Sequence, residues 1–313
     1  MKQPSPASAS RLRLSYRLLE QFAAWLPARA ACALAQLAAD RRWSVNRPLR
    51  RTIAANLSRL LGTPVREDDP MGREVCRNFS RSLLEFFAFQ RAHPALAIEG
   101  QVHLERCRAL GTILLTGHLG NWEVGAALIR RMGIAVTVVA QGHEDPQIDA
   151  MFVRQRRRCG LGVVPRGERA AQASLQQLRQ GAWLGVLGDW DLTGDGLRVC
   201  FGAGRLAVPR GPAVLSLRTG APVLPAVLIR EGPWAFRLFV EEPIWPAREA
   251  SIERAVESLS RRYAEVLARY ACRFPAQWLM FHDAIRPQGS GLEAVGLGAR
   301  ASSPEPGALS ALR

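Results

Sequence analysis

Residues 111–123 read G-T-I-L-L-T-G-H-L-G-N-W-E, and this stretch indicates the fold class of the chain. Residues 112–116 form a short apolar run with the length and composition of a buried strand. Gly117 and Gly120 then permit a tight turn, and Asn121 is a residue type that caps the start of a helix. The stretch therefore predicts a strand, a turn and a helix in succession.

The same alternation of short apolar runs and helix-like stretches continues along the chain. Further strands are predicted at residues 135–140, 162–164, 183–187, 222–229 and 236–240. Helices are predicted at residues 122–132, 147–159, 168–180, 212–219 and 250–273. Alternation of this kind is typical of an α/β architecture, in which helices flank a largely parallel central sheet.

The region before this alternation is helical in pattern. Residues 47–92 alternate basic and apolar positions and predict helices with an arginine-lined face. In residues 12–39 the apolar positions recur at helical spacing, but charged residues interrupt the run and Pro27 breaks it. Since a spanning helix needs about 20 apolar residues in succession, we expect amphipathic helices that lie at a bilayer surface. The pattern fits ordinary core-facing helices as well.

These patterns divide the chain into four parts. We expect residues 1–10 to be disordered, 11–95 to form an N-terminal membrane-associating helical region, 96–285 to form the α/β catalytic core and 286–313 to be a disordered tail. The first ten residues lack the pattern of a secretory signal, so export is not expected.

The charge of the chain points to anionic partners. The 42 basic and 27 acidic residues give a net charge of +15, and Lys2 is the only lysine. A GC-rich genome would explain the preference for arginine but not the excess of positive charge. The excess favours nucleic acid, anionic lipid headgroups or an acidic carrier protein. The 48% hydrophobic content is too low for a polytopic membrane protein.

The six cysteines are scattered and form no CxxC pair or other metal-ligand spacing. We interpret them as reduced thiols of a cytosolic compartment and expect no metal site.

The turn after residue 116 carries the chemistry, because reactive groups in open α/β sheets gather beyond the carboxyl ends of the strands. His118 is predicted to stand in the turn, and Glu123 in the first turn of the helix. An imidazole can take a proton from a hydroxyl when a carboxylate fixes its tautomer. Asn121 or backbone amides of the turn would stabilise the resulting oxyanion. The alternative is that His118 and Glu123 merely cap a helix.

The stretch T-G-H-L-G-N-W-E, residues 116–123, resembles the His-x4-acidic signature of the lysophospholipid acyltransferase superfamily. Its Glu form is typical of the bacterial lipid A late (lauroyl/myristoyl-type) acyltransferases and the related phosphatidylinositol mannoside acyltransferases. Three further elements of these families follow in the same order: an arginine-rich helix with a glycine, an aspartate loop and a late Gln-Trp-x-x-Phe-His element. They lie at residues 154–160, 188–213 and 277–282, and the resemblance covers about residues 12–286.

The resemblance implies a glycerolipid acyltransferase-like fold and direct acyl transfer without an acyl-enzyme. The donor would be acyl carrier protein (acyl-ACP) or acyl-CoA as a co-substrate, with no bound cofactor. The acceptor hydroxyl would belong to a membrane glycolipid, expected to be a lipid A precursor, with a phosphatidylinositol mannoside or another glycophospholipid as the alternative. The implied location is the cytoplasmic face of the inner (plasma) membrane, where the protein would be peripheral or N-terminally anchored on an anionic surface.

The resemblance also assigns roles to residues of the site. His118 would deprotonate the acceptor hydroxyl, and Glu123 would orient the imidazole and balance its charge. Gly188 and Asp189 match the aspartate loop and would shape the site or hold the acceptor. One departure is Cys200, which stands where many relatives have phenylalanine and leaves the acyl-chain preference open.

Arginines are the expected phosphate ligands of the site. Within the cluster of residues 156–158 we favour Arg158, because it immediately precedes Cys159 and Gly160, and Arg166 near the end of the next strand is a further choice.

Three rival interpretations are weaker. A serine hydrolase lacks its nucleophile elbow, because no G-x-S-x-G occurs. A metal hydrolase would need a second histidine four residues after His143, and His143 is taken as a loop residue. A basic membrane- or nucleic-acid-binding protein without catalysis is compatible with the charge, but no recognised nucleic-acid motif is present, so we expect no nucleic-acid partner.

Overall fold

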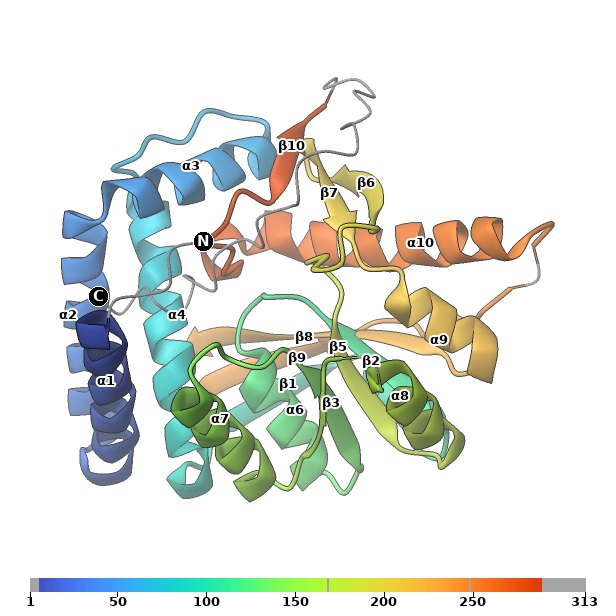
Figure 1. Cartoon of the computed structure of the whole chain (residues 1–313), viewed down its shortest axis with the longest axis horizontal. Helices are drawn as coiled ribbons and strands as arrows, with labels where there is room; N and C mark the ends of the chain where they lie inside the picture. Colours follow the sequence, from blue (N-terminus) through green and yellow to red (C-terminus); the bar gives the residue numbers. More distant parts are fainter. Residues whose placement is uncertain (1–5, 168, 248, 289–313) are drawn as a thin grey trace.

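The computed structural model describes residues 6–167, 169–247 and 249–288 (Figure 1). Its helices are α1 (Pro6–Trp25), α2 (Ala28–Val45), α3 (Arg47–Leu61), α4 (Pro70–Ala88), η1 (Phe89–Arg91), α5 (Gln101–Cys107), α6 (Trp122–Arg131), α7 (Pro146–Arg158), α8 (Ala170–Arg179), α9 (Gly211–Thr219), α10 (Ile252–Arg273) and η2 (Pro275–Gln277). Its strands are β1 (Ala95–Glu99), β2 (Thr112–Thr116), β3 (Val136–Ala140), β4 (Gly162–Pro165), β5 (Trp183–Leu187), β6 (Leu197–Phe201), β7 (Gly204–Val208), β8 (Val223–Gly232), β9 (Ala235–Val240) and β10 (Ile285–Pro287).

Seven strands form the central sheet in the order β1-β9-β8-β2-β5-β3-β4. The five strands from β8 to β4 are parallel to one another. β9 runs antiparallel to β8, and β1 runs parallel to β9. The prediction of an α/β protein with a largely parallel sheet flanked by helices is therefore confirmed. β2 has the bounds expected from the apolar run, and its burial on both faces explains why the run is continuous.

The two faces of the sheet are covered by different helices. Residues of α4, α6 and α7 pack on one face in a core that includes Leu114, Leu228 and Leu238. Residues of α10, with α8 and α9 beside it, pack on the other face over Ile113 and Val227. Adjacent strand positions thus point into opposite cores, as the pleat requires.

A second sheet was not expected from the sequence. β6 and β7 form an antiparallel hairpin, and β10 pairs with β7. The hairpin turns at Gly202, whose φ of 60° favours glycine. The hairpin lies within the aspartate-loop segment, residues 188–213, and its pairing with β10 joins that segment to the last described strand (Figure 1).

The N-terminal helices lie along one side of the molecule and pack on α4 (Figure 1). The predicted break at Pro27 separates α1 from α2. None of the helices in the described part of the chain is long and apolar enough to cross a bilayer.

Two predicted boundaries need correction. Helix α1 begins at Pro6, so residues 6–10 are helical, and residues 286 and 287 belong to β10. The rest of the predicted disordered ends, residues 1–5 and 289–313, lies outside the described residues.

Candidate active site

The imidazole of His118 is held by a buried carboxylate. Nδ1 of His118 lies 2.8 Å from Oδ1 of Asp189, and the backbone N–H of His118 donates to Oδ2 over 2.7 Å. The indole N–H of Trp278 donates to the same Oδ2 over 3.1 Å. Only 1% of the Asp189 side chain is exposed, against 15% for His118. The ring is thereby fixed with Nδ1 inward, which leaves Nε2 as the nitrogen for proton transfer.

The environment of Asp189 keeps it ionised. Burial by itself would raise the pKa of this carboxyl group, but the contacts with His118 and Trp278 outweigh burial and lower the pKa below its ordinary value. A carboxylate that stays charged can support an imidazolium during catalysis. Asp189, and not Glu123, is therefore the carboxylate in contact with the imidazole of His118.

The carboxylate of Glu123 has a different partner. Arg156 donates to it twice, from Nε over 3.1 Å and from Nη2 over 2.5 Å. Both side chains are mostly buried, with 14% and 10% exposed. The prediction that Glu123 is the direct partner of His118 is wrong in this structure. Nη1 of Arg156 is buried and has no partner among the described residues.

The turn between β2 and α6 is held on several sides. Gly120 has a φ of 64°, and a Cβ there would lie 1.8 Å from the carbonyl oxygen of Leu228, so this position requires glycine. The amides of Gly120 and Asn121 donate to the carbonyls of Gln277 and Leu228, and the carbonyl of His118 accepts from the amide of Leu279. These bonds tie the turn to β8 and to residues 277–279.

Asn121 caps α6, as predicted, by accepting from the amide of Val124. Its two amide hydrogens are donated to Glu85 and to the carbonyl of Ser82. No hydrogen remains for an oxyanion, and the amides of His118, Gly120 and Asn121 are also engaged. The predicted oxyanion role of Asn121 is therefore wrong.

The arginines favoured from the sequence lie away from the centre. Arg158 contacts Glu20 at the surface, and Arg166 donates to Gln141. Neither is among the described residues that line the cavity beside His118, whereas Arg156 is. Gly188 packs against Leu115 and donates its N–H to the carbonyl of Thr116, which brings Asp189 to the end of β2.

A largely apolar cavity begins at His118. It lies between the sheet and the helices α4, α6 and α7, and its buried apolar lining includes Phe86, Leu114, Ala126, Ile129, Ala226 and Leu238. Its polar lining is Ser82, Thr116, His118, Asn121, Glu123, Gln141, His143 and Arg156. His118 and the Glu123–Arg156 pair thus share one cavity, whose remaining lining is largely apolar.

Sequence reasoning missed several residues of this cavity and its surroundings. His143, taken as an incidental loop residue, lines the cavity, and burial together with Arg156 lowers its pKa to about 4. Trp190 packs edge-on against His118 and stacks on His282. The position of Trp190 directly after Asp189 was the available signal for it.

The fold and the site define an α/β protein with a histidine–aspartate pair beside a largely apolar cavity. The family model of the bacterial lipid A biosynthesis acyltransferases matches residues 16–286, and the chain belongs to this family. It is accordingly an O-acyltransferase.

Curated relatives and one solved structure are similar to the chain. A phosphatidylinositol mannoside acyltransferase of Mycobacterium tuberculosis is 30% identical over 248 residues, which cover 74% of this chain and 75% of that protein. Its counterpart in Mycolicibacterium smegmatis is 29% identical over 183 residues, or 57% and 56% of the two chains. The crystal structure of a 1-acyl-sn-glycerophosphate acyltransferase from Thermotoga maritima aligns with a TM-score of 0.36 at 19% identity, over 64% of this chain and 84% of that one.

Proposed function

We propose that the protein transfers a fatty acyl chain from an acyl-CoA or acyl-ACP thioester to a hydroxyl of a phosphatidylinositol mannoside. The observation that carries the chemistry is the His118–Asp189 pair at an apolar cavity. The relatives named as phosphatidylinositol mannoside acyltransferases favour this acceptor. A lipid A precursor is the second choice, because the family model that matches the chain is named for lipid A biosynthesis.

The proposed reaction has one addition and one elimination step. Nε2 of His118 takes the proton of the acceptor hydroxyl while Asp189 supports the imidazolium. The oxygen attacks the thioester carbonyl and forms a tetrahedral oxyanion. The C–S bond then breaks, and the thiolate receives the proton from His118. Ester and free thiol are the products, and no acyl-enzyme is formed.

Arg156 is the proposed donor to the oxyanion or to a phosphate of the donor. Its free Nη1 is buried at the cavity, where a hydrogen bond to developing charge is strong because water is excluded. Glu123 fixes the guanidinium through two hydrogen bonds. In this proposal Glu123 acts through Arg156 and not through His118.

Mass spectrometry of the reaction products tests the proposed function. The purified protein is incubated with palmitoyl-CoA or palmitoyl-ACP and, in separate reactions, with a phosphatidylinositol dimannoside or an underacylated lipid A precursor. We expect the dimannoside to gain one palmitoyl group. A gain on the lipid A precursor alone would establish the second acceptor, and no gain on either would refute the proposal.

The depth of the apolar cavity sets the proposed acyl length. Ala226 lies in its buried lining, and Ala226→Leu adds three carbon atoms to that wall. We expect the preferred chain to shorten by about three methylenes, since each excluded methylene forfeits about 0.8 kcal/mol, or roughly fourfold in kcat/KM. Rates with donors of eight to eighteen carbons measure this preference. Ala171→Leu on the exposed face of α8 is the control, and an unshifted profile in Ala226→Leu would place the acyl chain elsewhere.

The proposed location is the cytoplasmic membrane surface, with α1 and α2 as the contact. Leu14, Leu18, Phe22 and Trp25 lie along one face of α1 and are exposed, and Trp25 is 83% exposed. Leu34, Leu37 and Val45 are exposed on α2. A row of this kind suits a helix that lies in the interface of a bilayer.

Sedimentation with anionic vesicles tests this location. Replacing Phe22 and Trp25 by aspartate is expected to weaken binding at least roughly tenfold, since burial of each apolar side chain in the bilayer contributes about 1.5–3 kcal/mol to the binding free energy. Val102→Asp on α5, where valine is also exposed, is the matched control. Equal binding of both variants would contradict the proposed contact.

A further inference from the structure

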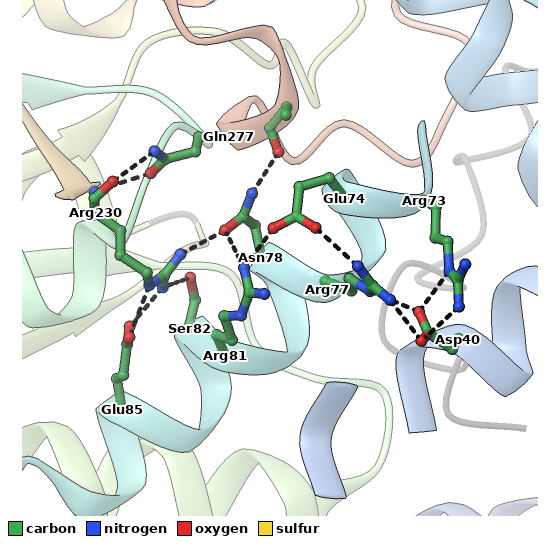
Figure 2. A network of polar contacts seen from close by, with 11 residues as sticks. Asp40, Arg73, Glu74, Arg77, Asn78, Arg81, Ser82, Glu85, Arg230 and Gln277 are labelled. Carbon is green, nitrogen blue, oxygen red and sulfur yellow. Dashed lines mark hydrogen bonds and ion pairs between the residues drawn. The ribbon is translucent and has the colours of Figure 1, made fainter. Parts of the chain in front are cut away.

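A buried ion pair joins α4 to β8 next to the catalytic turn. Nε of Arg230 donates to Glu85 over 2.7 Å and Nη2 over 2.5 Å (Figure 2). Only 6% and 2% of the two side chains are exposed. A buried pair is weak evidence for stability, because the loss of hydration offsets the attraction between the charges. The Glu85–Arg230 pair is therefore better explained by a role other than stabilising the fold.

The remaining donors of Arg230 bind the same helix. Nη1 donates to Oδ1 of Asn78 over 2.8 Å, and Nη2 donates to Oγ of Ser82 over 2.9 Å. Asn78, Ser82 and Glu85 lie on one face of α4, so the guanidinium is bound along two turns of this helix (Figure 2). The backbone of Arg230 is fixed too, because its N–H and C=O both bond the side-chain amide of Gln277.

Three residues that bind Arg230 also bind the catalytic turn. Oε2 of Glu85 accepts from Nδ2 of Asn121 over 2.8 Å, and Oγ of Ser82 donates to the carbonyl of Gly120 over 3.3 Å. The carbonyl of Gln277 accepts from the amide of Gly120 over 2.9 Å. Glu85 thus binds Asn121, the N-cap of α6, directly. Arg230 reaches the turn that carries His118 through Ser82 and Gln277, which both bind Gly120.

We propose that Glu85 and Arg230 are positioning residues, which hold the turn at residues 117–121 so that His118 and Glu123 face one cavity at a fixed separation. The inference rests on the proposed acyl transfer, but the position of the turn can be measured without it. The other end of the network, where Arg73 and Arg77 bind Asp40, is more exposed and contacts α2 instead of the turn (Figure 2).

Glu85→Gln is the principal test. Glutamine keeps the shape but has one acceptor oxygen, so it cannot serve both Arg230 and Asn121 as the carboxylate does. We expect faster hydrogen exchange of the amides at residues 117–124, with β5 unchanged. We also expect kcat with palmitoyl-CoA and phosphatidylinositol dimannoside to fall roughly 10- to 100-fold at an unchanged KM, since a small displacement of catalytic groups has effects of this size. Glu257→Gln, which breaks an exposed pair with Arg261, is the matched control and should alter neither.

A double variant tests for rescue. In Asn121→Asp with Glu85→Gln the new amide can donate to the new carboxylate, so the bond between residues 85 and 121 is restored with its direction reversed. Both variants with Asn121→Asp lose the bond from residue 121 to the carbonyl of Ser82, but aspartate remains a good helix cap. We expect slower exchange and a higher kcat in the double variant than in Glu85→Gln. Asn121→Asp alone should show fast exchange and a low kcat, because two carboxylates then meet.

Three outcomes would overturn the inference. They are wild-type exchange and kcat in Glu85→Gln, an equal effect of Glu257→Gln, or recovery of thermal stability in the double variant without recovery of kcat. If Glu85→Gln does not fold, Ser82→Ala removes only the hydroxyl that links Arg230 to Gly120, and unchanged exchange of the turn in that variant would also overturn it. Absence of turnover by the wild type would count against the proposed function alone, because exchange needs no substrate.

Discussion

Replacing His118 by alanine is expected to lower kcat for acyl transfer roughly 10²- to 10⁴-fold, the range that a positioned general base supplies. KM for the thioester should change little, since the imidazole handles a proton and does not hold the acyl chain. Initial rates with palmitoyl-CoA measure both constants.

His93→Ala is the matched control for this experiment. His93 lies exposed in the loop between η1 and β1, so its loss should leave kcat unchanged. The thermal midpoint of His118→Ala shows whether the fold is kept, and a folded variant with wild-type kcat would exclude His118 as the base.

Asp189→Asn is the second large effect, with kcat expected to fall roughly 10²- to 10⁴-fold as in other enzymes whose base histidine loses its carboxylate. Asparagine has one acceptor oxygen for the three donors from His118 and Trp278, and its amide presents hydrogen where Nδ1–H needs an acceptor. The histidine is then held in the wrong tautomer. Asp195→Asn, in the exposed loop that follows, should be neutral, and equal rates in both variants would contradict the assignment.

The same carboxylate makes stability depend on acid. Burial works to raise the pKa of Asp189, but His118 and Trp278 bring it below the value of about 3.9 for an unfolded chain. A lowered pKa in the folded state contributes stability above the unfolded pKa, and this contribution is lost as the pH falls through the folded pKa. The difference in the free energy of unfolding between the wild type and Asp189→Asn, measured by urea unfolding, should therefore be constant between about pH 5 and 7. It should become smaller below about pH 4. A difference in unfolding free energy that becomes larger in acid would contradict the lowered pKa of Asp189.

The strands and helices of the core followed from the sequence because their signals are local. The apolar run at residues 112–116, the two glycines and the cap at Asn121 specify their own strand, turn and helix. The hairpin of β6 and β7 was missed, because its burial comes from contacts with residues far away in the chain. The break at Pro27 is again a local property and was predicted correctly.

The partner of His118 was not predictable in the same way. The choice between Glu123 and Asp189 depends on which strand lies beside β2, and the neighbour is β5, whose end carries Asp189. Strand order is a property of the whole sheet, so it cannot be inferred from the six residues of the motif at 118–123. The choice of arginine was different, because Ile148, Phe152 and Arg156 recur at helical spacing on the buried face of α7. That periodicity favoured Arg156 over Arg158 and could have been used.

The contacts of residues 277–279 make the site depend on a segment that lies far from His118 in the sequence. Trp278 binds Asp189, the carbonyl of Gln277 accepts from Gly120, and the amide of Leu279 donates to the carbonyl of His118. A chain cut before Gln277 would keep His118, Asp189 and most walls of the cavity but would lose these three bonds. The catalytic turn and its carboxylate are therefore held in place only after the chain has folded back from α10 onto β2.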